Sequence, residues 1–419
     1  MVLSWLPGFL IENAAVKFYE GNFVHLLKNL TPETQIYQGW MSTFGLALLE
    51  ARQGGRVAEI VLDEMNLYFA DPFGVVYTPD GRTLYVSSSA VDAVSVVDVD
   101  AVKKLLNVQD GRIGASEEEI ARYARHLGIS AEYVVQRIPT GRNPKGMALA
   151  PDGKRLYVVN RLSDSITVID TPRQRPVGTI DLNGPAVETL LRRGEVLFNS
   201  STISFQRQLS CNTCHPEGHL DRISYDIAID GMGKNLVDNR TLRGIAHTYP
   251  FKWSGKNPDL FRQEGPRAAQ LFFRSHGYMP EDLKAIVAYV ESIPVPPNWH
   301  RREGLTPAQR RGKIIFERTV DNNGQPIPVM NQCITCHPPP YYTNQQAFDV
   351  GTKGPHDTRG SFDTPQLNNV YDRAPYLHDG RAYSLEEIWT IYNDGDRHGV
   401  ATDLTKQELN DLIEYLKSL

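Results

Sequence analysis

The sequence predicts a multidomain protein in which all-β repeats are followed by two tandem, mainly α-helical domains. Three observations lead to this prediction. A strand-rich motif occurs twice in the first half of the chain, a Cys-x-x-Cys-His motif occurs twice in the second half, and a similar helical pattern follows each copy of the cysteine motif. At 419 residues the chain is long for one domain and sufficient for two or three.

The strand-rich motif begins with Pro-Asp-Gly and repeats after 72 residues. Asp80-Gly-Arg-Thr-Leu-Tyr-Val matches Asp152-Gly-Lys-Arg-Leu-Tyr-Val, and Val94-Ser-Val-Val-Asp98 matches Ile166-Thr-Val-Ile-Asp170. Each copy predicts an Asp-Gly turn, a strand, a polar turn and a second strand. This order is typical of the blades of a β-propeller.

The repeat resembles the YVTN family of β-propeller repeats. A blade needs about 40 to 45 residues, so the offset leaves room for an insertion near 101–133, where Ser116 and Glu119 predict a helical capping box. A degenerate third blade is predicted at Leu46–Leu62, and residues 1–40 are ambiguous. The prediction therefore assigns 1–182 to propeller blades.

These blades are too few to close a propeller, since about four to eight are typical. Soluble proteins avoid the open sheet edges that an incomplete ring would expose. We therefore expect the remaining blades to lie upstream or to come from another chain.

The two cysteine motifs are Cys211-Asn-Thr-Cys214-His215, the first motif, and Cys333-Ile-Thr-Cys336-His337, the second motif. Each supplies two thiols for thioether bonds to one haem and a histidine for its iron. One zinc ion held by four thiolates and a redox-active or disulfide-bonded Cys-x-x-Cys are the alternatives. His-Pro follows both cysteine pairs, and the motifs use all four cysteines, so two covalent c-type haems are predicted.

The second half of the chain is an internal duplication. Leu242–Gly255 aligns with Leu367–Gly380 at an offset of 125, and the two motifs repeat at 122. Each copy ends in an amphipathic helix, and Thr405 with Glu408 predicts a capping box for the last one. Prolines at 294, 296 and 297 mark the junction. The first haem domain is therefore predicted at 183–298 and the second at 299–419.

Composition restricts the partners and the compartment. The net charge is −5, and there is neither a basic tract that would suggest nucleic acid nor an apolar run long enough for a transmembrane segment. Covalent haem attachment predicts a periplasmic or otherwise extracytoplasmic protein. The first sixteen residues contain no Lys or Arg for a signal-peptide n-region, so the expected export signal has been removed or lies upstream.

The tandem motifs and the segment Ala374-Pro-Tyr-Leu-His-Asp-Gly-Arg381 resemble the bacterial di-haem cytochrome c peroxidase family, which includes MauG. The resemblance covers about residues 185–419. In that family the distal ligand of the second haem lies fourteen residues after the His of His-Asp-Gly. Counted from His378, this position is Tyr392, on the face of a helix predicted from Ser384, and His398 is the competing ligand.

For the first haem, the motif itself makes His215 the proximal ligand, and the internal repeat supplies no distal ligand, so the distal face is expected to be open or to be bound by Met232. Arg267, the repeat counterpart of Tyr392, cannot bind iron, and Met232 lies in a glycine-rich segment nearby. Trp253 matches a tryptophan that carries electron holes between the haems, and Gln263 matches a distal-pocket glutamine. The acid/base glutamate of the family is replaced by Phe273, and Glu264 is the candidate substitute.

The resemblance also implies an inter-haem calcium site formed by Asn239 and the backbone carbonyls of Arg373 and Pro375. The leading hypothesis is a peroxidase-like or MauG-like oxidoreductase that passes electrons between two haems, with peroxide or a protein as its substrate. The alternative is a non-catalytic electron-transfer subunit that its propeller docks onto a larger redox complex. Either function needs a redox partner protein or a small electron donor.

Overall fold

The computed structural model describes residues 43–49, 57–124, 126–225, 235–301 and 303–419. The segments 1–40 and Met232 lie outside these residues. The described chain divides into two compact units. The first unit contains the described residues up to Pro216 together with Ala268–Tyr289, and the second unit contains Glu217–Arg267 and Val290–Leu419. The predicted domain boundaries at 182 and 298 stay predictions.

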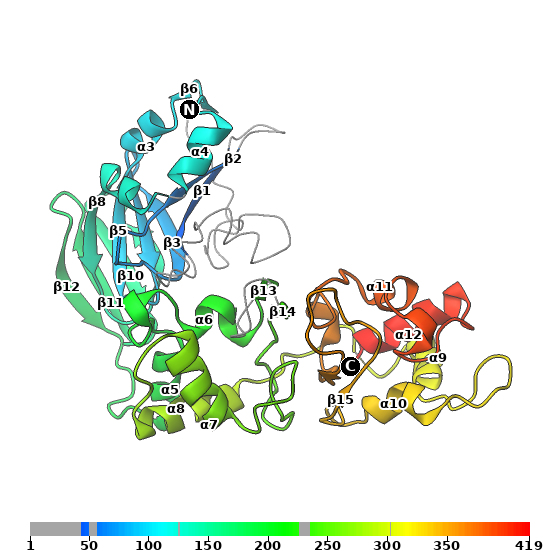
Figure 1. Ribbon diagram of the computed structural model, residues 1–419. Coiled ribbons are helices and arrows are strands. Elements are labelled where there is room, and N and C mark those ends of the chain that lie inside the picture. The colour runs from blue at the N-terminus through cyan, green and yellow to red at the C-terminus, as the bar shows by residue number, and fades with distance from the viewer. Residues whose placement is uncertain (1–42, 50–56, 125, 226–234, 302) are drawn as a thin grey trace. The chain divides into compact units, whose positions relative to one another are not determined.

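Two four-stranded antiparallel sheets form most of the first unit (Figure 1). The first sheet has the order β3-β4-β5-β8, and the second has the order β12-β11-β10-β9. Both sheets are simple meanders, as the repeat predicts, with each Asp-Gly turn leading into the second strand. Their strands are β3 (Pro72–Tyr77), β4 (Thr83–Ser88), β5 (Ala93–Asp98), β8 (Val134–Pro139), β9 (Pro144–Leu149), β10 (Arg155–Asn160), β11 (Ser165–Asp170) and β12 (Arg175–Asp181).

The predicted insertion interrupts the first sheet between β5 and β8. It contains α3 (Val99–Leu105) and α4 (Glu117–Tyr123), and the capping box of Ser116 and Glu119 is confirmed at the start of α4. In the degenerate third repeat, β1 (Gly45–Leu49) and β2 (Val57–Val61) pair antiparallel, and the residues of this repeat between the two strands lie outside the described residues. The shorter elements here are β6 (Val108–Gln109), β7 (Arg112–Ile113) and η1 (Leu127–Glu132).

A hydrophobic core lies between the two sheets. Tyr85, Val94 and Val96 of the first sheet pack with Leu156 and Val158 of the second. These side chains alternate along their strands with residues that face the other way, which is the period expected of a sheet with one buried face. The two sheets therefore pack face to face in the first unit.

The opposite face of the second sheet is also apolar. Tyr157 and Val159 of β10 are 37% and 41% exposed, and Ile180 of β12 is 45% exposed. The register pairs Val159 with Ile166 and Ile166 with Ile180, so Val159, Ile166 and Ile180 form one cross-strand row on that face. An antiparallel sheet that faces water normally presents polar residues there.

Each cysteine motif is followed in sequence by a helix that crosses an earlier one. In the first unit, α5 (Leu190–Phe198) meets α8 (Pro280–Ser292), and Phe198 packs on Tyr289 with ring centroids 5.3 Å apart. In the second unit, α9 (Pro307–Phe316) meets α12 (Lys406–Lys417), and Phe316 packs on Tyr415 at 5.5 Å. The repeated crossing supports the predicted duplication.

The predicted capping boxes are present at α12, where Thr405 pairs with Glu408, and a further one forms at α9. The remaining elements between residues 205 and 396 are short. They are η2 (Phe205–Arg207), α6 (Cys211–Cys214), η3 (Pro216–Gly218), β13 (Ser224–Tyr225), β14 (Val237–Asp238), α7 (Leu260–Arg262), η4 (Gln263–Phe272), η5 (Val329–Asn331), α10 (Cys333–Cys336), β15 (Ala347–Phe348), β16 (Phe362–Asp363), η6 (Val370–Asp372), α11 (Leu385–Thr390) and η7 (Asp394–Asp396).

Candidate haem sites

The second motif forms the short helix α10, with Cys333 and Cys336 at its two ends. Nδ1 of His337 lies 2.9 Å from the carbonyl oxygen of Tyr342. In a neutral imidazole this contact makes Nδ1 the protonated nitrogen and leaves the lone pair on Nε2. Burial lowers the pKa of His337, which keeps the ring neutral. These are the properties of a histidine that binds iron through Nε2, so the residues fit a c-type haem.

Tyr392 follows α11 rather than lying within it. Ser384 caps this helix, as predicted, and accepts a hydrogen bond from the backbone of Glu387, but the helix ends at Thr390. The expectation that one helical face carries both Leu385 and Tyr392 is therefore wrong in this detail. Tyr392 still packs against the hydrophobic cluster of the second unit, and its N–H donates to the carbonyl of Glu387 at 3.2 Å.

The Tyr392 hydroxyl donates a hydrogen bond to the carbonyl oxygen of Arg381 at 3.0 Å, and the Arg381 guanidinium lies 5.8 Å from the centre of its ring. His398 has a different environment. Its Nδ1 is shielded from solvent and has no hydrogen-bond partner. Burial, followed by repulsion from His337, lowers the pKa of His398 to about 4. The repulsion indicates that the His398 ring lies near the proximal histidine.

The backbone around His398 is held against the second motif. Its N–H donates to the side chain of Asn393 at 2.7 Å, and its carbonyl accepts from the Trp389 indole at 3.1 Å. A Cβ on the next residue, Gly399, would lie 3.3 Å from Sγ of Cys333. This loop therefore runs directly beside one of the two haem-attachment cysteines.

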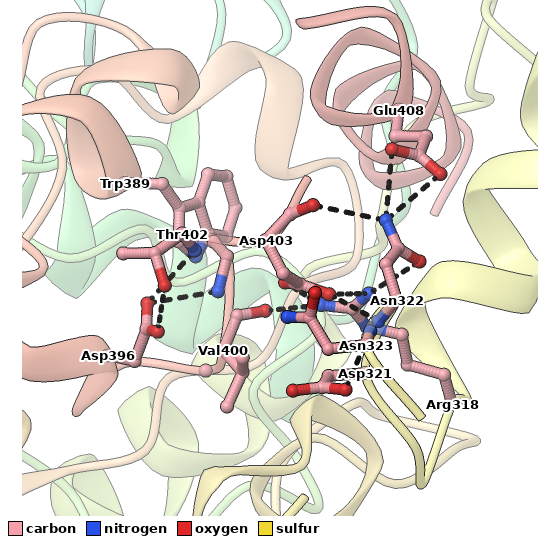
Figure 2. A network of polar contacts seen from close by, with 12 residues as sticks. Arg318, Asp321, Asn322, Asn323, Trp389, Asp396, Val400, Thr402, Asp403 and Glu408 are labelled. Atoms are coloured by element: carbon pink, nitrogen blue, oxygen red, sulfur yellow. Dashed lines mark hydrogen bonds and ion pairs between the residues drawn. The ribbon is translucent and has the colours of Figure 1, made fainter. Parts of the chain in front are cut away.

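Figure 2 shows the polar network that fastens the same loop. The Arg318 guanidinium donates to both carboxylate oxygens of Asp403 at 2.7 and 2.8 Å and to the Val400 carbonyl at 2.8 Å. The two charged side chains are only 11% and 5% exposed, so solvent screens this pair less than a surface ion pair. Asp396 accepts from the backbone of Thr402 at 3.2 Å. These bonds hold the loop against Arg318, which follows the end of α9.

The first motif forms α6 in the first unit and is capped differently. Ser210 and Thr213 form a capping box, and both hydroxyls also donate to the carboxylate of Asp71. Sequence reasoning missed Asp71 because it lies 139 residues before Ser210 and no local pattern connects them. In α10 the N-cap residue Gln332 makes no side-chain capping bond.

Trp253 lies in the second unit, bound to the segment of Asp238. Its indole N–H donates to the Asp238 carbonyl at 2.9 Å, and the Asp238 N–H donates to the His378 carbonyl at 2.7 Å. The ring of His378 stacks on Phe362 with centroids 3.7 Å apart, and its Nε2 lies 2.7 Å from Asp357. Asp238 of β14 therefore links the backbone of His378 to the indole of Trp253. Trp253 is the residue that corresponds to His378 in the internal repeat.

Glu264 is 6% exposed, and burial raises its pKa to about 7, although the Lys252 ammonium opposes the shift. The pKa of Lys252 is itself lowered to about 8, mainly by burial. The neighbouring Gln263 accepts a hydrogen bond from the Asn257 amide. Phe273, at the position of the family's glutamate, is buried, and its carbonyl accepts from the backbone of Phe205.

The expected calcium ligands lie in the second unit. The Asn239 amide donates to Asp221 at 3.3 Å. Burial, followed by repulsion from Asp221 and Asp379, raises the pKa of the nearby Asp238 carboxyl to about 9. The Arg373 guanidinium donates to the carbonyl of Gln366 at 2.8 Å, and burial lowers its pKa to about 10.

Among the described residues, no group of three or more His, Cys, Asp or Glu is arranged to hold a metal ion. The predicted calcium site uses other ligands, namely the Asn239 side chain and the carbonyls of Arg373 and Pro375, so it stays a prediction. No described helix combines the length and the apolar character needed to cross a membrane.

Comparison with known proteins identifies a cytochrome c domain at residues 322–419. This range contains the second motif and therefore supports covalent haem c there. The hydrazine synthase beta subunit of Kuenenia stuttgartiensis is 33% identical over 144 residues, which cover 34% of this chain and 36% of that subunit. MauG of Methylorubrum extorquens is 24% identical over 274 residues, covering 54% of this chain and 76% of MauG.

A solved structure of Kuenenia stuttgartiensis hydrazine synthase aligns at 27% identity and a TM-score of 0.49, covering 56% of this chain and 89% of that one. The gamma subunit of the same enzyme is 30% identical over 292 residues, covering 57% of this chain and 79% of the subunit. The chain belongs to the family of the hydrazine synthase gamma subunit, among the relatives of di-haem cytochrome c peroxidases and MauG.

Proposed function

We propose that this protein is a di-haem c-type oxidoreductase in which a haem at each motif passes electrons to the other. The main support for this proposal is that the helix crossing beside the first motif is repeated beside the second. Gly194 and Phe198 at the first crossing correspond to Gly312 and Phe316 at the second. Haem supplies one-electron chemistry and, where its iron is open, reaction with a small oxidant. The residues of the chain supply attachment, axial ligands and proton transfer.

Proton transfer is assigned to Glu264. A general acid or base works best when its pKa is near the operating pH, and the pKa of about 7 meets this condition. The side chain is shielded from water, and Lys252 lies close enough to stabilise its charged form. Glu264 therefore takes the place of the family's glutamate, whose position holds Phe273. Gln263 orients the bound oxidant, and Trp253 carries electrons between the two haems.

Two side chains compete for the distal position of the second haem. Tyr392 occupies the position of the family's ligand, but its hydroxyl is engaged by the Arg381 carbonyl and would have to leave that contact. His398 has an unpartnered ring nitrogen and lies near His337. The family resemblance assigns Tyr392 as the distal ligand of the second haem. The environment of His398 favours His398 as the ligand instead.

The second candidate function is a non-catalytic electron-transfer subunit. It is favoured by the apolar row of Val159, Ile166 and Ile180 on the outer face of the second sheet, because one propeller blade offers such a face to the next. Two of the relatives are named as subunits of hydrazine synthase. We infer that the second sheet packs against a further blade from another part of the protein or from a partner chain.

Covalent haem attachment places the protein in an extracytoplasmic compartment in this proposal, with a redox protein or a small molecule as its electron donor. EPR of the fully oxidised protein tests the two functions. Catalysis at the first haem predicts one high-spin ferric signal, because an iron with an open position is five-coordinate or water-bound. Two low-spin signals would instead support pure electron transfer and would contradict the catalytic proposal.

A further inference from the structure

Asp71 is a buried carboxylate of the first sheet, immediately before β3, and is 3% exposed. One oxygen accepts from the Thr213 hydroxyl at 2.7 Å. The other accepts from the Ser210 hydroxyl at 2.5 Å and from the Asn212 amide at 3.5 Å. These three donors surround Cys211, so a single carboxylate contacts most of the helix that bears the first motif.

The two hydroxyls depend on this carboxylate. Each hydroxyl has one proton to donate, and each already accepts a backbone N–H: Thr213 N–H reaches Ser210 Oγ at 3.1 Å, and Ser210 N–H reaches Thr213 Oγ1 at 2.9 Å. Both hydroxyl protons then go to Asp71. Without the carboxylate, the two hydroxyls could donate only to each other across 3.3 Å, so at least one buried donor would lose its acceptor, which is unfavourable.

The sheet side of the contact is equally fixed. The Asp71 carbonyl accepts from the N–H and the hydroxyl of Ser89 at 2.8 and 2.9 Å. The Ala90 carbonyl accepts from the N–H and the hydroxyl of Ser201, both at 3.0 Å. The chain just before the first motif is therefore bound to the same edge of the sheet, and Asp71 cannot shift independently of it.

Among the residues that the structure describes, the second motif has no counterpart to this arrangement. The N-cap residue of α10, Gln332, makes no side-chain capping bond. The two motifs are otherwise alike in sequence and in their helix, so within the described part of the chain the buried carboxylate distinguishes the first motif from the second. Asp71 is not required simply to form a Cys-x-x-Cys-His helix.

We propose that Asp71 is a positioning residue that couples the propeller-like sheets to the first haem, by fixing the orientation of α6 and hence of Cys211, Cys214 and His215. The inference rests on the proposed presence of a haem at the first motif. It assigns the sheets a role in setting the properties of a haem in addition to their role in contacting partners. A change at this carboxylate should alter the first haem and leave the second unchanged.

The test compares Asp71→Ala and Asp71→Asn with a matched control, Asp63→Asn, in the full-length holoprotein. Asp63 is another buried carboxylate near the sheets, but it accepts from the backbone of Phe44 and Phe69 at 2.6 and 2.7 Å and does not contact the first motif. EPR-monitored redox titration follows each haem separately. Mass spectrometry of the intact wild type counts its haems.

Asp71→Ala is expected to shift the ferric signal and the midpoint potential of the first haem only. Asp71→Asn keeps an acceptor and the side-chain shape, and should retain more of the wild-type signal. Asp63→Asn should lower thermal stability and leave both haem signals unchanged. If Asp71→Ala does not fold, Thr213→Val removes one of the donors with little change of shape and should produce a smaller shift of the same signal.

Unchanged first-haem spectra and potential in the folded Asp71 variants, or an equal shift in Asp63→Asn, would overturn the proposal while leaving two haems in place. A wild type that carries one haem would overturn the di-haem assignment as well as this inference. The two failures are therefore distinguished by the haem count of the unmodified protein.

Discussion

A Cβ atom added to Gly312 would lie 1.9 Å from the carbonyl oxygen of Asp411, because α9 and α12 cross in backbone contact at this point. In the first unit the same relationship joins Gly194 and Ala285, where the distance would be 2.0 Å. The absence of a side chain thus sets the spacing of the helices at both crossings. Phe316 and Tyr415 then pack beside the crossing.

Gly312→Ala is expected to destabilise the second unit. In an open helix the change would stabilise by about 1 kcal/mol through helix propensity. Here the methyl group meets backbone that cannot rotate away, and overpacking of this kind costs about 1–3 kcal/mol or more. Thermal unfolding should therefore shift to lower temperature. Gly146→Ala is the control, because an added Cβ meets no atom within 4 Å there, and an equal shift in both variants would contradict the argument.

The haem count is the second prediction. Because each motif is complete, the intact wild type should carry the mass of two covalent haems. Replacing both Cys211 and Cys214 by Ala should leave one haem, and replacing Cys333 and Cys336 should leave the other. Colour that is lost on acid–acetone extraction, or a mass excess of one haem in the wild type, would contradict the prediction.

Local patterns predicted much of this fold correctly. The capping boxes at Ser116 and Thr405 and the hairpins after each Asp-Gly turn depend on residues within a few positions of one another. Contacts between distant segments were missed. Asp71 lies 139 residues from Ser210, and Arg318 lies 85 residues from Asp403, and no periodicity relates either pair. The end of α11 was also missed, because the apolar pattern continues past Thr390 although the helix does not.

Peroxide turnover, if the first haem is catalytic, should depend on Glu264. Glu264→Gln keeps the shape and removes the ionisable group, so the rate should fall by about 10²- to 10⁴-fold, the usual effect of losing general acid–base help. The wild-type rate should follow a titration near pH 7, in line with the raised pKa. Glu281→Gln, at an exposed carboxylate that pairs with Lys284, is the control. A pH profile that is identical in Glu264→Gln would exclude this role.

The raised pKa of Glu264 also predicts how stability depends on pH. The unfolded carboxyl ionises near its model value of 4.5, whereas the folded one ionises at about 7. The folded state therefore retains a proton that the unfolded state releases between these values, so this group's contribution to stability is lost as the pH rises through 7. Chemical unfolding of wild type and Glu264→Gln at pH 5 and pH 8 should show a smaller loss of stability in the variant.

The apolar face of the second sheet should mediate association. Val159→Glu places a charge in the row formed with Ile166 and Ile180 and should disfavour packing of another sheet there. Light scattering should show less self-association than in the wild type. Val135→Glu, at a valine of β8 that is 53% exposed, is the control. A wild type that is monomeric at all concentrations and binds no blade-containing partner would contradict the inference.

The last prediction concerns the distal ligand of the second haem. Tyr392→Phe keeps the ring and removes the hydroxyl that now bonds to Arg381, so packing should change little. If the phenolate binds the iron, the second haem becomes five-coordinate or water-bound and its potential rises, because an anionic ligand that favours ferric iron is lost. His398→Phe tests the competing ligand, because it removes a ring nitrogen that has no hydrogen-bond partner. Optical and EPR spectra of the two variants decide between the ligands. Unchanged spectra in Tyr392→Phe together with a high-spin signal in His398→Phe would make His398 the ligand and leave Tyr392 as a core tyrosine.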